Sequence, residues 1–134
     1  MKSYTDLEQS KKLAEILPIE SADMWLAERY KGQCMLNGEY IVEEKPVYYL
    51  SFVKPSEYNY SQDVIKDIPC WSLSALLQIL PLPTLEETMI TRTKTKWKCT
   101  ASCESRAEYW SELHNNPIDA CVELIIILHE QNII

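Results

Sequence analysis

Two cysteines and two histidines in the second half of the chain have the side chains that zinc prefers. Cys99 and Cys103 are separated by three residues, and His114 and His129 follow them. A zinc site needs its ligands to converge within about 2.0–2.3 Å of one point. An extended backbone over 99–103 would hold the two thiols about 13 Å apart, and the histidine spacing does not fit a zinc finger. We therefore interpret the cysteines as free thiols and predict no metal ligand and no cofactor.

A cysteine nucleophile is the second chemistry that the residue types allow. Cys70, His114 and Asp119 supply a thiol, a base and an orienting carboxylate. A thiol at the start of a helix can also have a lowered pKa. Nothing in the spacing distinguishes this triple from others, so we assign no catalytic residue. A cysteine-dependent enzyme is kept as the second alternative function.

Glycine content excludes several other activities. The 134 residues include only two glycines, Gly32 and Gly38. A phosphate-binding loop and a dinucleotide fingerprint both need several glycines at fixed spacing. A glycine-flanked nucleophilic serine is also absent. The chain therefore lacks the motifs of the commonest nucleotide-binding proteins and serine hydrolases.

A short basic stretch stands out in an acidic chain, which has 13 Lys and Arg against 20 Asp and Glu and a net charge of -7. Its cations alternate with other residues and are Arg92, Lys94, Lys96 and Lys98. The alternation predicts one strand over residues 91–99, with all four cations on one face at a spacing of about 6.6 Å. Such a row could bind an anionic partner such as nucleic acid, which an acidic chain otherwise repels.

The same row has a structural interpretation, which we favour. If Cys99 pairs with Ser105 in a hairpin, Lys96 lies opposite Glu108 and Arg92 lies opposite Glu112. Lys94 then lies opposite Trp110. Opposite-charge and cation–π pairs of this kind stabilise a hairpin by a few tenths to about 1 kcal/mol each. The anionic-partner interpretation is the first alternative.

The aromatic residues are more numerous than one core of this size needs, so they are either half-buried residues of the sheets or part of a surface for a protein partner. Tyr58 and Tyr60 lie in a long predicted loop over residues 54–69, and Trp110 lies in a predicted strand. Loops of this length are often functional, and Tyr and Trp are enriched at protein interfaces. We therefore predict that these three residues contribute to a partner surface.

Three helices are indicated by capping residues and apolar periodicity. Thr5 and Glu8 form a capping box for a helix over residues 5–17, which Pro18 ends. A second helix is predicted over 71–80. Asn116 and Pro117 begin a third, which runs to about 130. The third helix is apolar around most of its circumference, so it is either central to the core or an interface in a homo-oligomer.

Strands are predicted between these helices. Asn37-Gly38 is the signal for a type I′ hairpin joining 33–36 to 39–42. Residues 24–31 are ambiguous between strand and short helix, and we prefer strand. Further strands are predicted over 47–53, 91–99 and 104–113. The fold class is therefore α+β: one domain over 1–134, with three helices on antiparallel hairpin-based sheets in the order α-β-β-β-α-β-β-α.

The cellular compartment of the protein can be inferred from its N-terminal residues, its apolar runs and its cysteines. The first residues are polar and do not resemble a secretory signal, and no apolar run approaches the length of a membrane span. Five cysteines, an odd number, favour free thiols in a reducing cytoplasm. We expect a cytoplasmic protein with no membrane contact.

Several phrases of the sequence resemble a group of small uncharacterised proteins of gut anaerobes, their prophages and other mobile elements. The phrases are residues 5–18, 21–24, 68–73, 116–122 and 128–129. The group has no established activity, so the resemblance implies only a cytoplasmic bacterial or phage-derived protein. From all of these features we predict a small, non-catalytic protein-binding or regulatory module.

Overall fold

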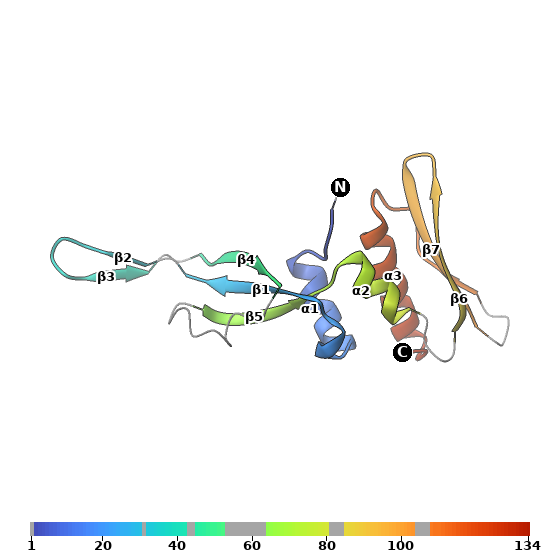
Figure 1. The fold of residues 1–134 in the computed structure, drawn as a ribbon, viewed down its shortest axis with the longest axis horizontal. Helices are drawn as coiled ribbons and strands as arrows, with labels where there is room; N and C mark the ends of the chain where they lie inside the picture. The colour runs from blue at the N-terminus through green and yellow to red at the C-terminus, as the bar shows by residue number, and fades with distance from the viewer. Residues whose placement is uncertain (1, 31, 43–44, 53–63, 81–84, 104–107) are drawn as a thin grey trace.

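The computed structural model describes residues 2–30, 32–42, 45–52, 64–80, 85–103 and 108–134 (Figure 1). The fold is α+β, as predicted. The helices are α1 (Leu7–Ile16), α2 (Leu73–Ile79) and α3 (Pro117–Glu130), with a short 3-10 helix at Ile19–Ser21. The strands are β1 (Met24–Arg29), β2 (Gly32–Cys34), β3 (Tyr40–Val42), β4 (Val47–Ser51), β5 (Val64–Cys70), β6 (Leu85–Thr93), β7 (Lys96–Cys103) and β8 (Glu108–Trp110). Within the described ranges no helix is long and apolar enough to cross a membrane.

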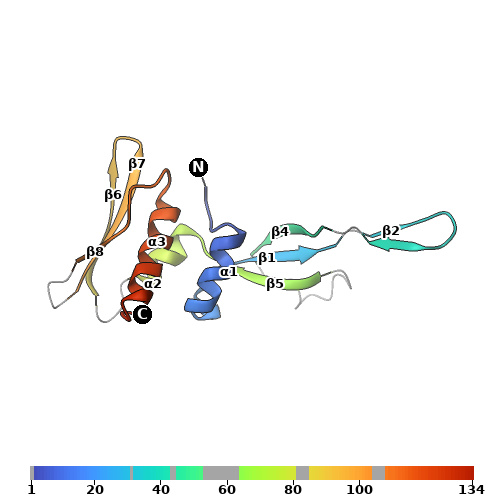
Figure 2. The same cartoon turned by 180° about the vertical axis from the view of Figure 1, so that it is seen from behind.

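The helices lie between two antiparallel sheets, which gives the molecule an elongated shape (Figures 1 and 2). One sheet has the strand order β4-β1-β5, and the other has the order β6-β7-β8. The β2–β3 hairpin extends the first sheet outward as an arm. α1 packs against β5, and α3 packs against β7, so the core lies between the helices and the second sheet.

α3 lies at the centre of the core, which is one of the two positions predicted for a helix with an apolar circumference. Asn116 caps it, with its side chain accepting from the Asp119 backbone N–H at 2.9 Å, and Pro117 occupies the first turn, as predicted. The buried residues of the helix are Pro117, Ile118, Ala120, Cys121, Val122, Leu124, Ile125 and Leu128. This chain itself therefore covers most of the apolar surface that could have served a homo-oligomer.

The N-cap of α1 lies one residue later than predicted, at Asp6 instead of Thr5. The Asp6 carboxylate accepts from the Gln9 backbone N–H at 2.8 Å, and the Gln9 side chain accepts from the Asp6 N–H at 3.1 Å. Thr5 is instead fully buried, and its hydroxyl accepts from the backbone N–H of Trp71 at 3.1 Å. The predicted Thr5–Glu8 capping box is therefore wrong, because tertiary contacts occupy the Thr5 hydroxyl.

Residues 24–29 form a strand, as preferred, but the nearby hairpin turn differs from the prediction. Met35 pairs with Glu39 and Gly38 donates to the Met35 carbonyl at 2.9 Å, so the loop contains three residues. Gly38 has φ +86, and Asn37 is not among the residues with positive φ. A three-residue loop needs positive φ only at its last residue, which explains why the predicted type I′ turn does not form.

Part of the predicted loop over 54–69 is a strand. Residues 64–70 form β5, which pairs antiparallel with β1. β1 is therefore the central strand of its sheet, between β4 and β5, and its residues Leu26 and Ala27 are buried. Pro69 is tolerated because β5 lies at the edge of its sheet. Tyr58 and Tyr60 lie outside the described residues.

The predicted single strand over 91–99 is also wrong, because the chain reverses in its middle. Thr93 pairs with Lys96, and the two residues between them form the turn. Lys94 has φ +54, a conformation that Gly or Asn usually adopts. The partner strand predicted over 104–113 is present as β8, which pairs with residues 100–102 of β7.

Candidate functional site

The β6-β7-β8 sheet has a buried face and an open face. Cys99 and Ala101 of β7 are fully buried against α3. Successive strand residues point to opposite faces, so the alternate residues point away from the helices. We call this second surface the outer face. From the paired register, its members are Glu87, Met89, Thr91 and Thr93 of β6, Lys96, Lys98, Thr100 and Ser102 of β7, and Glu108 and Trp110 of β8.

The hairpin distributes the four predicted cations over two strands and a turn. Lys96 and Lys98 lie on the outer face, and Lys94 lies in the turn beside them. Arg92 lies on the opposite face, where its guanidinium is 5.5 Å from the centre of the Trp97 ring. The cations therefore gather at one end of the sheet, although not in the single row that was predicted. We call Arg92, Lys94, Lys96 and Lys98 the basic end.

The predicted charge ladder does not form. Lys96 lies opposite Thr93, and Arg92 lies opposite Trp97. Glu108 instead lies opposite Ser102, and the Glu112 backbone N–H donates to Glu123 at 2.9 Å. Among the described residues, the ion pairs involve Lys2 and His114 and none of the basic end. The interpretation of these cations as a ladder satisfied within the hairpin is therefore wrong.

Lys98 and Trp110 form the one aromatic contact of the outer face that the described residues show. The Lys98 ammonium lies 5.6 Å from the centre of the Trp110 ring, and Trp110 is 54% exposed. This predicted partner-surface residue is therefore accessible, beside a cation. The predicted hairpin register placed Lys94 there instead, because the turn at 94–95 carries no Gly, Pro, Asn or Asp to reveal it.

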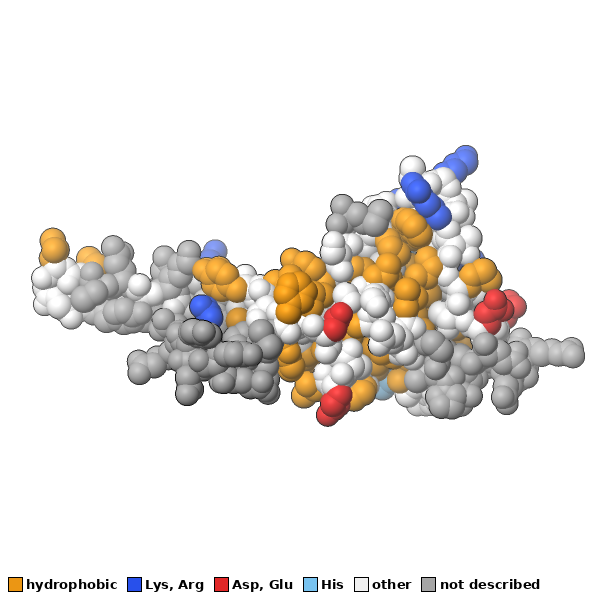
Figure 3. Space-filling view, in the orientation of Figure 1, with side chains coloured by type: hydrophobic (Ala, Val, Ile, Leu, Met, Phe, Trp, Pro, Cys, Tyr) orange, Lys and Arg blue, Asp and Glu red, His pale blue; other side chains and the backbone are white. Residues whose placement is uncertain are grey.

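The outer face changes sign along its length. Glu87 and Glu108 flank Ser102 at the end opposite the hairpin turn, and both side chains are exposed. Figure 3 shows Lys and Arg side chains at the end of the hairpin and acidic side chains lower on the same sheet. The positive region is therefore short.

The candidate cysteine triad is not assembled. Cys70 is fully buried, and its thiol donates to the Thr5 carbonyl at 3.3 Å. His114 pairs with Glu123, and the Asp119 carboxylate accepts from Lys2 at 2.7 Å. Burial raises the pKa of the Cys70 thiol, which is opposite to what a nucleophile needs. The structure thus provides no support for this alternative.

Among the four candidate zinc ligands, the three whose side chains are described, Cys99, His114 and His129, do not converge either. The Cys121 thiol contacts the Cys99 sulfur at 3.8 Å inside the core, where both cysteines are free. His129 is exposed at the end of α3, and the Cys103 side chain lies outside what the structure describes. No group of three or more potential metal ligands occurs among the described side chains.

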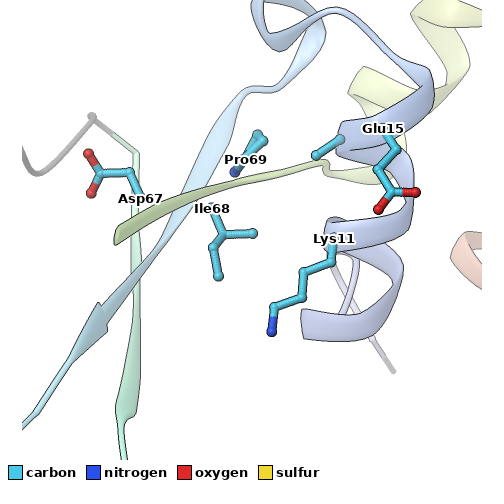
Figure 4. Close-up of a pocket in the computed structure, with 6 residues that line it drawn as sticks. Lys11, Glu15, Asp67, Ile68 and Pro69 are labelled. Carbon is cyan, nitrogen blue, oxygen red and sulfur yellow. The ribbon is translucent and has the colours of Figure 1, made fainter. Parts of the chain in front are cut away.

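A groove of about 290 Å³ lies between α1 and β5 (Figure 4). Lys11 and Glu15 line it from α1, while Ile68 and Pro69 contribute an apolar wall from β5. Both charged side chains on α1 are exposed. The groove therefore presents exposed charges of both signs and does not define one kind of ligand.

The chain matches no protein-family model, no curated protein sequence and no solved structure.

Proposed function

We propose that this protein is a small, non-catalytic binding module that holds an acidic segment of another protein against the three lysines of the basic end, beside the outer face. One observation carries the proposal: Lys94, Lys96 and Lys98 stand together with no carboxylate partner among the described residues. Unmatched cations beside an exposed Trp are typical of a recognition surface, since Trp supplies contact area and Lys supplies orientation.

The short length of the basic end favours an acidic protein segment over a long polyanion. Glu87 and Glu108 lie on the same face, a few residues from the lysines. A nucleic acid that continued along the face would meet these carboxylates, and the net charge of -7 would repel it further. A segment with a few carboxylates fits the positive region alone.

Nucleic acid remains a second candidate because of one specific contact. Single-stranded nucleic acids bind where aromatic rings stack on bases beside cations that meet the phosphates. Lys98 and the exposed Trp110 ring form such a neighbouring pair. This candidate predicts that binding depends on the Trp110 ring as strongly as on the lysines.

We place the module in a bacterial cytoplasm, in a cell or mobile element of the kind that the sequence resemblance implies. Cys70, Cys99 and Cys121 are free thiols, which supports a reducing compartment. A regulatory role follows from the proposed activity, since the protein would act by occupying its partner.

Neutralising the three lysines of the basic end should abolish most of the binding. We expect the triple variant Lys94→Gln, Lys96→Gln, Lys98→Gln to bind a fluorescein-labelled oligoglutamate peptide about tenfold or more weakly than the parent protein. The dependence of affinity on salt should also decrease, because fewer ion contacts form. Fluorescence anisotropy at several salt concentrations measures both quantities.

The matched control is Lys11→Gln, Lys12→Gln, Lys45→Gln, which removes the same charge from exposed positions elsewhere. Its affinity should stay close to that of the parent. An equal loss in both variants would show that only net charge matters and would refute the site. Tighter binding of a labelled oligothymidylate, lost on Trp110→Ala, would replace the proposal with the nucleic-acid candidate.

A further inference from the structure

β6 is an edge strand whose outer side has no partner in the described part of the chain. The sheet order is β6-β7-β8, so β6 pairs with β7 alone. β7, in contrast, is paired on its second side by β8 and by the segment that follows β8. An edge strand of this length is a template for another strand.

The backbone groups that point out of this edge can be identified from the bonds of β7. Trp97 exchanges backbone hydrogen bonds with His114 at 2.7 and 2.8 Å, and the Cys99 carbonyl accepts from the Ser111 N–H at 2.8 Å. These β7 residues therefore direct their backbone groups away from β6. Arg92 lies opposite Trp97, and Ile90 lies opposite Cys99. Both are non-hydrogen-bonded pairs of the antiparallel ladder, in which the backbone N–H and carbonyl groups of the two residues point away from each other. The backbone groups of Arg92 and Ile90 therefore point away from β7.

The same alternation applies one pair further along. Thr88 lies opposite Ala101, two residues beyond Ile90 in the ladder. The N–H and carbonyl groups of Thr88, Ile90 and Arg92 thus all point to the open edge. A strand added there would find three evenly spaced residues, each with one donor and one acceptor.

The charges along this strand are arranged for pairing with a copy of itself. The exposed Glu87 lies near the start of β6, and Arg92 and Lys94 lie at its end. Two β6 strands that run antiparallel bring the acidic start of each beside the basic end of the other. Two parallel strands would place like charges together, which destabilises cross-strand pairs.

We infer that a second copy of this chain binds at the β6 edge, so that the protein forms a dimer about a twofold axis through Ile90. In this register Ile90 meets Ile90 of the partner subunit, and Thr88 of each chain meets Arg92 of the other. All the outward backbone groups of the three residues are then paired. The half-exposed Met89 would lie opposite Thr91 on the outer face and become covered.

This symmetric pairing closes on itself, because the same edge is used by both copies. It joins the two three-stranded sheets into one continuous sheet. The two outer faces also become one continuous surface, to which each copy contributes its own Trp110 and Lys98. Glu87 of each copy lies near the hairpin turn of the other copy. The inference goes beyond the proposed function, which does not require a dimer.

Sedimentation velocity from low micromolar to near-millimolar protein should show a reversible monomer–dimer equilibrium. We expect Glu87→Lys to weaken dimerisation about tenfold, because it places a cation beside the basic end of the other copy. The control is Glu108→Lys, the same change on the same face but on β8, and it should leave the dimer unaffected. Glu87→Lys combined with Lys94→Glu should restore dimerisation, because the unlike charges meet again.

Blocking the β6 edge tests directly whether the second copy binds there. The Arg92 N–H has no backbone partner in the described part of the chain, so Arg92→Pro should preserve the circular dichroism spectrum while abolishing the dimer. A wild-type protein that stays monomeric at every concentration would overturn the inference. The inference would also be overturned if folded Arg92→Pro protein dimerised with an unchanged association constant. It would equally be overturned if Glu87→Lys combined with Lys94→Glu failed to restore dimerisation.

Discussion

Replacing Trp71 with alanine should lower the free energy of unfolding by about 3–5 kcal/mol, the range measured when large buried aromatic residues are removed. Small domains are stable by only about 5–15 kcal/mol. We therefore expect the Trp71→Ala variant to lose a large fraction of its stability and to unfold at a much lower urea concentration than the parent protein. Urea titration followed by circular dichroism provides the measurement.

The size of this effect follows from the position of Trp71 between three parts of the chain. Its side chain is fully buried in the core shared by the helices. Its indole N–H donates to the Ser21 hydroxyl at 3.0 Å. Its backbone N–H donates to the Thr5 hydroxyl at 3.1 Å, and its carbonyl accepts from the Thr5 N–H at 2.9 Å. Removal of the ring leaves a cavity and leaves Ser21 without its donor.

The control is Trp110→Ala, which removes the same side chain from an exposed site. Trp110 is 54% exposed, and its described contact is with Lys98. We expect a loss of less than about 1 kcal/mol. Equal losses for the two variants would show that Trp71 is not the central core residue that the structure indicates.

Loss of the Asp119 carboxylate should destabilise the protein by about 1–2 kcal/mol near neutral pH, and the loss should disappear in acid. Asp119 lies in the first turn of α3, where a negative charge is favourable. It accepts hydrogen bonds from the side chains of Lys2, Gln9 and Asn116, each at 2.7 Å. The magnitude is modest because the group is partly exposed and screened by salt.

The pH dependence of the stability follows from the directions in which the pKa values of Asp119 and Lys2 are shifted. Burial raises the pKa of Asp119, but the hydrogen bonds from Lys2, Gln9 and Asn116 outweigh burial and hold it below its usual value. The contribution to stability is therefore complete above the unfolded pKa of about 3.9 and is lost as the pH falls through the lower folded pKa. Burial lowers the pKa of Lys2, but its bonds to Asp119 and Asp6 raise it overall. The contribution of the Lys2 charge to stability is therefore lost in alkaline solution, as the pH rises above about 10.4 and through the raised folded pKa.

The variant Asp119→Asn, measured by urea denaturation across this pH range, isolates the contribution of the carboxylate. Its difference from the parent should be largest near neutral pH and should shrink below about pH 4. The exposed Glu15→Gln is the matched control and should show little difference at any pH. A difference for Asp119→Asn that does not change with pH would indicate a packing effect instead of the charge.

The sequence alone determined the helices and the fold class. Asn116 and Pro117 mark the start of α3 through hydrogen bonds within one turn of the chain. The apolar residues of this helix recur around its axis, and they form the core. Signals of this kind act over a few residues, so they persist whatever surrounds them. The one-residue error at α1 arose where a distant residue, Trp71, used the hydroxyl of Thr5.

Only the tertiary structure decided where strands end and what they expose. Lys94 adopts a positive φ in a turn that no turn-forming residue announces, because pairing of β6 with β7 over its whole length compensates for that conformation. That reversal moved the four cations from one row to one end of a sheet and brought Lys98 beside Trp110. Strand pairing joins residues far apart in the chain, and the free energy that selects a register comes from packing across the whole sheet. The site that we propose therefore depends on contacts that no local pattern specifies.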